Sequence, residues 1–140
     1  MAGENMENIC RQVEEHLYSL HCLVNDVKDI SHATLCSHRG IPTANFNHAF
    51  RVNVTESEAD KLIADVVRYY QSMEVKPCFV VSPLTRPHNF TDYLQRAGFK
   101  PVLEETAMVY RDEGKSFEVG SDVNVVVVDG SMLEFGQMFT

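Results

Sequence analysis

The chain has 140 residues, of which 44% are apolar and 23% charged, close to the averages of globular domains. This composition indicates one folded domain and excludes disordered, collagen-like and coiled-coil chains. The net charge is -8 and no basic run concentrates positive charge, so nucleic acid is not an expected partner. No stretch approaches the roughly 18 consecutive apolar residues of a membrane span, and the acidic amino terminus lacks a signal-peptide pattern. We therefore expect a cytoplasmic protein without a membrane segment.

The first half of the chain predicts a long helix followed by strands. Apolar residues recur at steps of three and four over residues 9–27, which is typical of one helix face. Residues 31–39 precede a break at Gly40 and Pro42 and predict a short strand and a turn. Over residues 46–54 the side chains alternate, which predicts a half-buried strand whose apolar face consists of Phe46, His48, Phe50, Val52 and Val54.

A second helix is expected to begin after Thr55. Thr55 and Glu58 have the spacing of a capping box, in which the two side chains bond to free amides at the start of a helix. Apolar residues at helical spacing continue this helix to Met73. The apolar run at residues 78–81 then predicts a central strand that is covered on both faces.

Two further elements are predicted before the composition changes. A helix over residues 90–97 is closed by Gly98, with Phe99 packing back onto it. Residues 102–110 alternate and predict a strand, without indicating which of its faces is buried.

The domain organisation follows from the carboxyl-terminal part of the chain. After a domain at residues 1–112, residues 113–122 are polar and contain glycine, which predicts a linker. Residues 123–140 predict a strand and an amphipathic helix that reaches the last residue without a stop signal. We therefore expect the chain to be the front part of a longer protein, or its last element to pack on a partner.

The order of these elements resembles that of the GNAT acyltransferase superfamily, in particular the degenerate amino-terminal half of its tandem two-domain members. The resemblance implies an α/β (α+β) fold with a mixed, V-shaped central sheet flanked by helices, and a strand-helix extension at the carboxyl end. In such proteins the second half binds acetyl-coenzyme A, and residues 123–140 resemble its opening elements. The resemblance covers roughly residues 5–112 and rests on the strand at 46–54, the helix after Thr55, the exit at Pro83, the Arg86-Pro87 pair, the segment LQRAGF ending at Phe99, and Met108.

The cofactor of this superfamily places its pyrophosphate on free amides at a helix amino terminus, reached through a glycine-rich turn. The equivalent turn here, residues 54–59, contains no glycine and carries the carboxylates of Glu56 and Glu58. The predicted cap would also occupy the amides. We therefore expect that this chain binds no cofactor, that a second domain would hold acetyl-coenzyme A, and that the chain is a non-catalytic scaffold or substrate-side half of an N-acetyltransferase.

Two other interpretations stay open at this point. One is a divergent, active single-domain acetyltransferase, and the other is a stand-alone interaction or small-ligand module that kept the fold without the cofactor. The expected partners are a carboxyl-terminal GNAT domain or a second copy of the chain, with a small-molecule amine as the substrate of the complete protein.

The sequence offers no catalytic residue, because its six histidines are spread over helix, strands and turns and none stands out as a general base. The substrate-pocket candidates are Asn47, Arg51 and Arg86, at a strand face and a strand-to-helix turn, where α/β proteins commonly place ligand contacts. Each has a structural alternative, which is to satisfy backbone groups or surface charge.

The four cysteines are scattered and form no CxxC pair, which favours reduced thiols over disulfides. The nearest approach to a set of metal ligands is Cys22, His32, Cys36 and His38, whose spacing matches no established zinc pattern. The sequence therefore predicts no metal site.

Overall fold

The computed structural model describes residues 2–109 and residue 114. Contacts divide the chain into two units, Met1–Ala107 and Met108–Thr140, and every helix and strand of the described residues lies in the first. The linker predicted at 113–122, apart from Gly114, and the strand and helix predicted at 123–140 lie outside the described residues.

Helix α1 (Ala2–Val24) is followed directly by strand β1 (Asp26–Ile30). The predicted helix therefore ends at Val24 instead of Val27, and β1 has no counterpart among the predicted elements. Asn25 closes the helix, with its backbone N–H donating to the carbonyl of His21 at 2.8 Å. Val27, the last residue of the helical pattern, pairs with Cys36 in the sheet, so cross-strand pairing overrides the helical periodicity.

The described residues form an α+β fold with a three-stranded antiparallel sheet in the order β1-β2-β3. β1 pairs with β2 (Ala33–Ser37), which confirms the strand predicted within 31–39, and every residue of β2 is buried. β2 pairs in turn with β3 (His48–Phe50). The expected mixed sheet is not seen in this part of the chain, because parallel pairing is limited to isolated bridges that join Ala49 to Phe79 and Asn53 to Arg86.

β3 covers only part of the strand predicted at 46–54. Arg51 has a φ of 55°, which interrupts the extended backbone. Before this point both faces of β3 are buried, since Ala49 belongs to the core and the ring of His48 contacts α1. Beyond it, the predicted alternation of buried and exposed residues holds through Val54.

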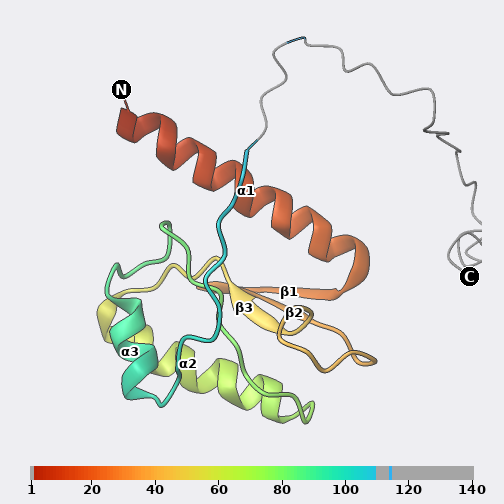
Figure 1. Ribbon diagram of the computed structural model, residues 1–140. Helices are drawn as coiled ribbons and strands as arrows, with labels where there is room; N and C mark the ends of the chain where they lie inside the picture. Colours follow the sequence, from red (N-terminus) through yellow and green to blue (C-terminus); the bar gives the residue numbers. More distant parts are fainter. Residues whose placement is uncertain (1, 110–113, 115–140) are drawn as a thin grey trace, which may run out of the picture. The chain divides into compact units, whose positions relative to one another are not determined.

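Helix α2 (Glu56–Gln71) confirms the helix predicted after Thr55 and packs its apolar face on the sheet. The hydroxyl of Tyr70, which is fully buried, donates to the carbonyl of Cys36 at 2.8 Å and fixes the helix to β2. Figure 1 shows α1 on the opposite side of the sheet from α2 and α3, so the sheet is covered on both faces. The buried residues of α2 are Ala59, Leu62, Ile63, Val66 and Tyr70.

Residues 78–81 do not form the buried central strand that the sequence predicts. Phe79 makes a single parallel bridge with Ala49, beyond β3, and no strand is assigned there. Val80 and Val81 are 39% and 40% exposed. Among the described residues this segment lies at the edge of the sheet and has no second neighbour to cover it.

Helix α3 (Phe90–Arg96) and its predicted termination are confirmed. Gly98 has a φ of 91°, a conformation that glycine adopts without a steric penalty. The N–H of Phe99 then donates to the carbonyl of Leu94 at 2.9 Å, as in a Schellman motif. The Phe99 ring packs back 5.3 Å from that of Phe79.

The strand predicted at 102–110 is not formed at residues 102–109, all of which are exposed. An extended segment becomes a strand only where a neighbour pairs with its backbone, and the described residues contain no strand that pairs with this one. Residue 110 lies outside the description. No helix within residues 2–109 is both long and apolar enough to cross a bilayer.

Candidate functional site

The turn before α2 is the place where the resemblance to GNAT acyltransferases predicts a cofactor contact. Thr55 is the N-cap residue, but its side chain makes no capping hydrogen bond, so the predicted occupation of the amides by Thr55 is wrong. Its hydroxyl instead donates to a carboxylate oxygen of Glu58 at 2.6 Å. A charge-assisted bond to a carboxylate within reach is stronger than a bond to a neutral backbone group, which explains the difference.

The carboxylate of Glu58 adds negative charge at this turn. The hydrogen bond from Thr55 holds the pKa of Glu58 below its usual range, so this carboxylate is ionised at neutral pH. Glu56 also lies in the first turn of α2. The positive end of the helix dipole stabilises both carboxylates, and their negative charge would repel a pyrophosphate group at the same place.

The sheet edge next to this turn is closed by backbone pairing. The N–H of Arg86 donates to the carbonyl of Val52 at 3.0 Å, and the N–H of Val54 donates to the carbonyl of Arg86 at 3.1 Å. The guanidinium of Arg86 donates to the carbonyls of Pro83 and Thr85 at 3.1 and 3.0 Å. The backbone of Arg86 therefore pairs its loop with residues 52–54, and its side chain bonds within that loop.

Asn47, the first substrate-pocket candidate, is fully buried and bonded to its own loop. Its Oδ1 accepts from the N–H of His38 at 2.9 Å, while its Nδ2 donates to the carbonyls of Ile41 and Thr43 at 2.6 and 3.0 Å. These contacts support the structural alternative for Asn47, which is to close the loop that leads into β3.

Arg51 lies on the α1 side of the fold. Its guanidinium lies 4.7 Å from the ring centroid of Tyr18, and its charge contributes to lowering the pKa of Asp29. The described contacts of Asn47, Arg51 and Arg86 share no residue, so the structure gives no common pocket for the three.

An open groove of about 460 Å³ lies elsewhere, between β1 and α2. Its lining alternates basic and acidic side chains over an apolar floor that includes Leu35 and Leu62. None of the three predicted candidates lines it. The charged residues along the groove are Lys28, His32, Glu58, Lys61, Asp65 and Arg68.

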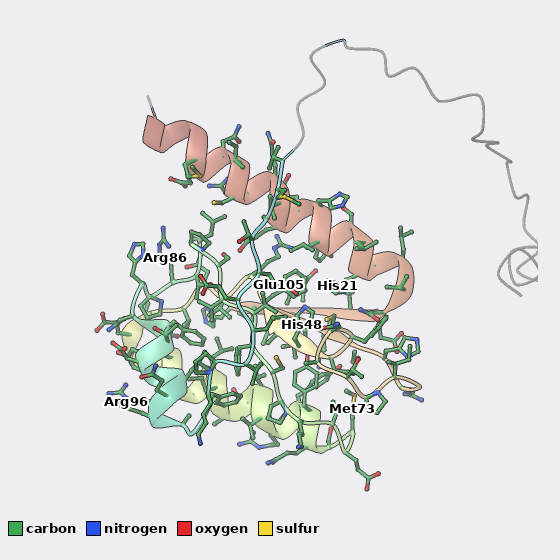
Figure 2. All side chains as sticks on the ribbon, in the orientation of Figure 1. His21, His48, Met73, Arg86, Arg96 and Glu105 are labelled. Carbon is green, nitrogen blue, oxygen red and sulfur yellow. The ribbon has the colours of Figure 1, made fainter. Side chains whose placement is uncertain are left out.

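Three residues that could bind a metal ion meet between α1 and the sheet. His21 of α1, Cys36 of β2 and His48 of β3 each offer one ligand atom, and these atoms lie within 4.8 Å of one another. Figure 2 shows the two histidines next to each other. Their ring centroids are 4.8 Å apart, in an edge-on arrangement. Cys36 and His48 are opposite one another in the antiparallel register, which places both on the same sheet face.

The hydrogen bonds of the cluster orient its rings. His48 Nδ1–H donates to the carbonyl of Ala44 at 2.8 Å, which leaves Nε2 with the lone pair. Asn25 Nδ2 donates to Nδ1 of His21 at 2.8 Å, and Oδ1 of Asn25 is buried without a hydrogen-bond partner. The Cys36 thiol donates to the carbonyl of His48 at 3.4 Å.

Burial sets the charge state of the cluster. Desolvation lowers the pKa of both His21 and His48, so both imidazoles are neutral at pH 7. For His48, the bond to Ala44 and the charge of Glu105 act in the opposite direction, while His21 adds to the lowering. Burial also raises the pKa of the Cys36 thiol, so it is protonated.

Only Cys36 belongs both to this cluster and to the set of ligands weighed from the sequence. Linear spacing could not indicate the cluster, because its members come from three elements that only the tertiary fold brings together. The available signal was a polar residue within an apolar pattern. His48 lies on the predicted apolar face of its strand, and His21 lies four residues after Leu17 in the stripe of the first helix.

The comparisons with known proteins leave the resemblance to GNAT acyltransferases as an inference from the sequence. Neither the family models, nor the curated proteins, nor the solved structures include one that matches this chain.

Proposed function

We propose that this chain is the non-catalytic half of a GNAT-like acetyltransferase, which shapes the substrate side of the complete protein and does not itself bind acetyl-coenzyme A. The order of its elements supports this proposal. A helix precedes antiparallel strands, a helix follows β3 after a glycine-free turn, and the next segment contacts β3 in the parallel direction through Ala49 and Phe79.

The observation that carries the proposal is the backbone pairing of Arg86 with residues 52–54, which follow β3. In the superfamily the V-shaped sheet holds the cofactor, whereas here Arg86 occupies the edge through hydrogen bonds with Val52 and Val54. A ligand along this stretch would have to break both bonds. A backbone group left buried without a partner costs about 1–3 kcal/mol, so the pairing strongly disfavours an acyl-coenzyme A molecule there.

The turn chemistry acts in the same direction. The ionised Glu58 carboxylate accepts from Thr55 at the start of α2, and Glu56 is in the same turn. These charges repel a pyrophosphate. The acidic charge at the turn and the backbone pairing of Arg86 both act without a side-chain cap.

The test is a titration of the full chain with acetyl-coenzyme A, in which binding is measured by calorimetry and by thermal denaturation. We expect no saturable binding below the millimolar range and no rise in melting temperature, since a ligand that binds the folded state must raise it. The double variant Glu56→Gln, Glu58→Gln removes the charge and leaves the strand edge closed, so it should also fail to bind. Saturable submillimolar binding by the unmodified chain would refute the proposal.

A second candidate function is a stand-alone interaction module, and exposed apolar residues favour it. Val102 and Leu103 are 84% and 70% exposed, and Leu23 near the end of α1 is 81% exposed. Sedimentation of the full chain and of the Val102→Ser, Leu103→Ser variant separates the two candidates. If the unmodified chain associates and this variant associates less, the interaction module is favoured. If the encoding reading frame continues into a glycine-rich cofactor turn, the non-catalytic half of an acetyltransferase is favoured.

A further inference from the structure

We propose that His21, Cys36 and His48 bind one transition-metal ion, Zn²⁺ in the first instance, through two imidazole nitrogens and one thiolate. This site is independent of the proposed acetyltransferase role, because it lies between α1 and the sheet and uses none of the residues at the turn before α2. The inference rests on the convergence of three ligand atoms from α1, β2 and β3 within 4.8 Å of one another.

The spacing is close to what a tetrahedral ion requires. Zinc bonds of about 2.0–2.1 Å to nitrogen and about 2.3 Å to sulfur place neighbouring ligand atoms of a tetrahedral site about 3.3–3.6 Å apart. The three atoms therefore need to approach a common centre by about 1 Å, which small side-chain rotations can supply. Three protein ligands leave a fourth position for water or another donor, as in catalytic zinc sites.

The outer hydrogen bonds fit the same role. A ligating histidine usually donates its other ring N–H to a carbonyl or carboxylate, and His48 already does so toward Ala44 at 2.8 Å. Rotation of the Asn25 amide would place its unpartnered Oδ1 against Nδ1–H of His21 and would free Nε2 of that ring. The metal-bound state would then have both histidines in the same tautomer, each fixed by an acceptor.

The donor set selects the class of ion. A thiolate with two imidazoles suits Zn²⁺, Co²⁺ or copper, whereas Mg²⁺ and Ca²⁺ prefer oxygen ligands. Binding displaces the proton of the Cys36 thiol into solvent and leaves the bound site with one positive charge. The carboxylate of Glu105 is close enough for its charge to act on His48, so it partly compensates this charge.

The test uses the full chain without an affinity tag, stripped with a chelator and titrated with Zn²⁺ under reducing conditions. We expect one ion per chain and a higher melting temperature, with no response to Mg²⁺. Co²⁺ serves as the spectroscopic probe, because a thiolate ligand gives a charge-transfer band that nitrogen and oxygen ligands do not. The band should appear in the unmodified chain and be absent from Cys36→Ser.

His21→Gln is the decisive variant, because His21 is only partly buried and its replacement should leave the fold intact. Loss of a direct ligand should weaken Zn²⁺ binding by at least about 100-fold, and loss of the outer partner in Asn25→Ala by about 10-fold. Cys78→Ser is the matched control, since Cys78 is a neighbouring half-buried thiol outside the cluster. It should keep the stoichiometry, the affinity and the Co²⁺ band.

Three results would overturn the site. They are the absence of saturable Zn²⁺ binding by the unmodified chain, unchanged affinity in His21→Gln, and a Co²⁺ band that depends on Cys78 instead of Cys36. Because Cys36 is buried, Cys36→Ser could unfold, so circular dichroism is recorded for each variant. The Zn²⁺ affinity of His21→Gln tests the metal site even if Cys36→Ser does not fold.

Discussion

Replacement of Asn47 by alanine tests whether this residue closes a loop or awaits a ligand. The side chain is fully buried, and its three hydrogen bonds join it to the backbone of His38, Ile41 and Thr43. Alanine removes the amide and leaves the N–H of His38 and the carbonyl of Ile41 without this partner, whereas the carbonyl of Thr43 keeps the backbone N–H groups of Phe46 and Asn47. We expect the substitution to destabilise the fold even though no ligand is present.

The magnitude follows from those three bonds. A typical hydrogen bond contributes about 1 kcal/mol net, so losing three costs about 3 kcal/mol of the free energy of unfolding. The carbonyl of Thr43 keeps its backbone donors, and water that reaches the carbonyl of Ile41 would reduce the loss further, which sets a lower bound of about 2 kcal/mol. For a domain of this size such a change lowers the melting temperature by roughly 10–20 °C.

The assay is urea and thermal denaturation of the full chain, followed by circular dichroism. Asn45→Ala is the matched control, because it makes the same substitution at an exposed position of the same loop and should change stability by less than about 0.5 kcal/mol. If both variants lose equally little stability, the structural role argued for Asn47 is wrong and a ligand-contacting role is favoured.

Three further predictions concern other elements. Tyr70→Phe removes the hydroxyl that donates to Cys36 and should cost about 1 kcal/mol in urea denaturation, whereas Tyr70→Ala should cost about 3–5 kcal/mol because it also opens a cavity. Gly98→Ala should cost about 1–2 kcal/mol from backbone strain alone at φ 91°, since the added methyl meets no atom within 4 Å; an unchanged midpoint would contradict this. Hydrogen bonds from Thr34 and Tyr18 lower the pKa of Asp29, so the ionised carboxylate stabilises the fold above the ordinary carboxyl pKa, and this contribution is lost as pH falls through the lowered value. The small difference in stability between the unmodified chain and Asp29→Asn should therefore shrink toward acid pH. A difference that stays constant with pH would contradict this prediction.

The elements that the sequence predicts well are those with a complete local signal. The stripe of α2 and the Gly98-Phe99 end of α3 each carry their periodicity and their terminator within a short segment. Residues 78–81 and 102–109 have strand-like side chains, but whether they become strands depends on neighbours that the local sequence does not specify. β1 is the reverse case, because its polar residues become a strand only through pairing with β2.

The contacts of the predicted site residues show a related physical limit of local patterns. Asn47, Arg51 and Arg86 are polar residues at suitable places in the expected sheet, but each finds its partners locally. Burial of a polar group requires such partners, and a single sequence does not show whether they come from the protein or from a ligand. The His21, Cys36 and His48 cluster has the opposite character, because its members are far apart in sequence and meet only when α1 lies on the sheet.

The way α1 is held to the sheet connects the metal site to the stability of the fold. Leu20, Leu23 and Val24 of α1 are about half exposed or more, so apolar burial contributes less to this helix than to α2. Polar contacts also hold α1 to the sheet. The hydroxyl of Tyr18 donates to Asp29 at 2.8 Å, and this bond raises the pKa of Tyr18 to about 12. A metal ion shared by His21 and the sheet would add its binding free energy directly to the docking of α1. Zinc should therefore protect the backbone amides of α1 from hydrogen exchange more than those of α2, and equal protection of both helices would separate metal binding from helix docking.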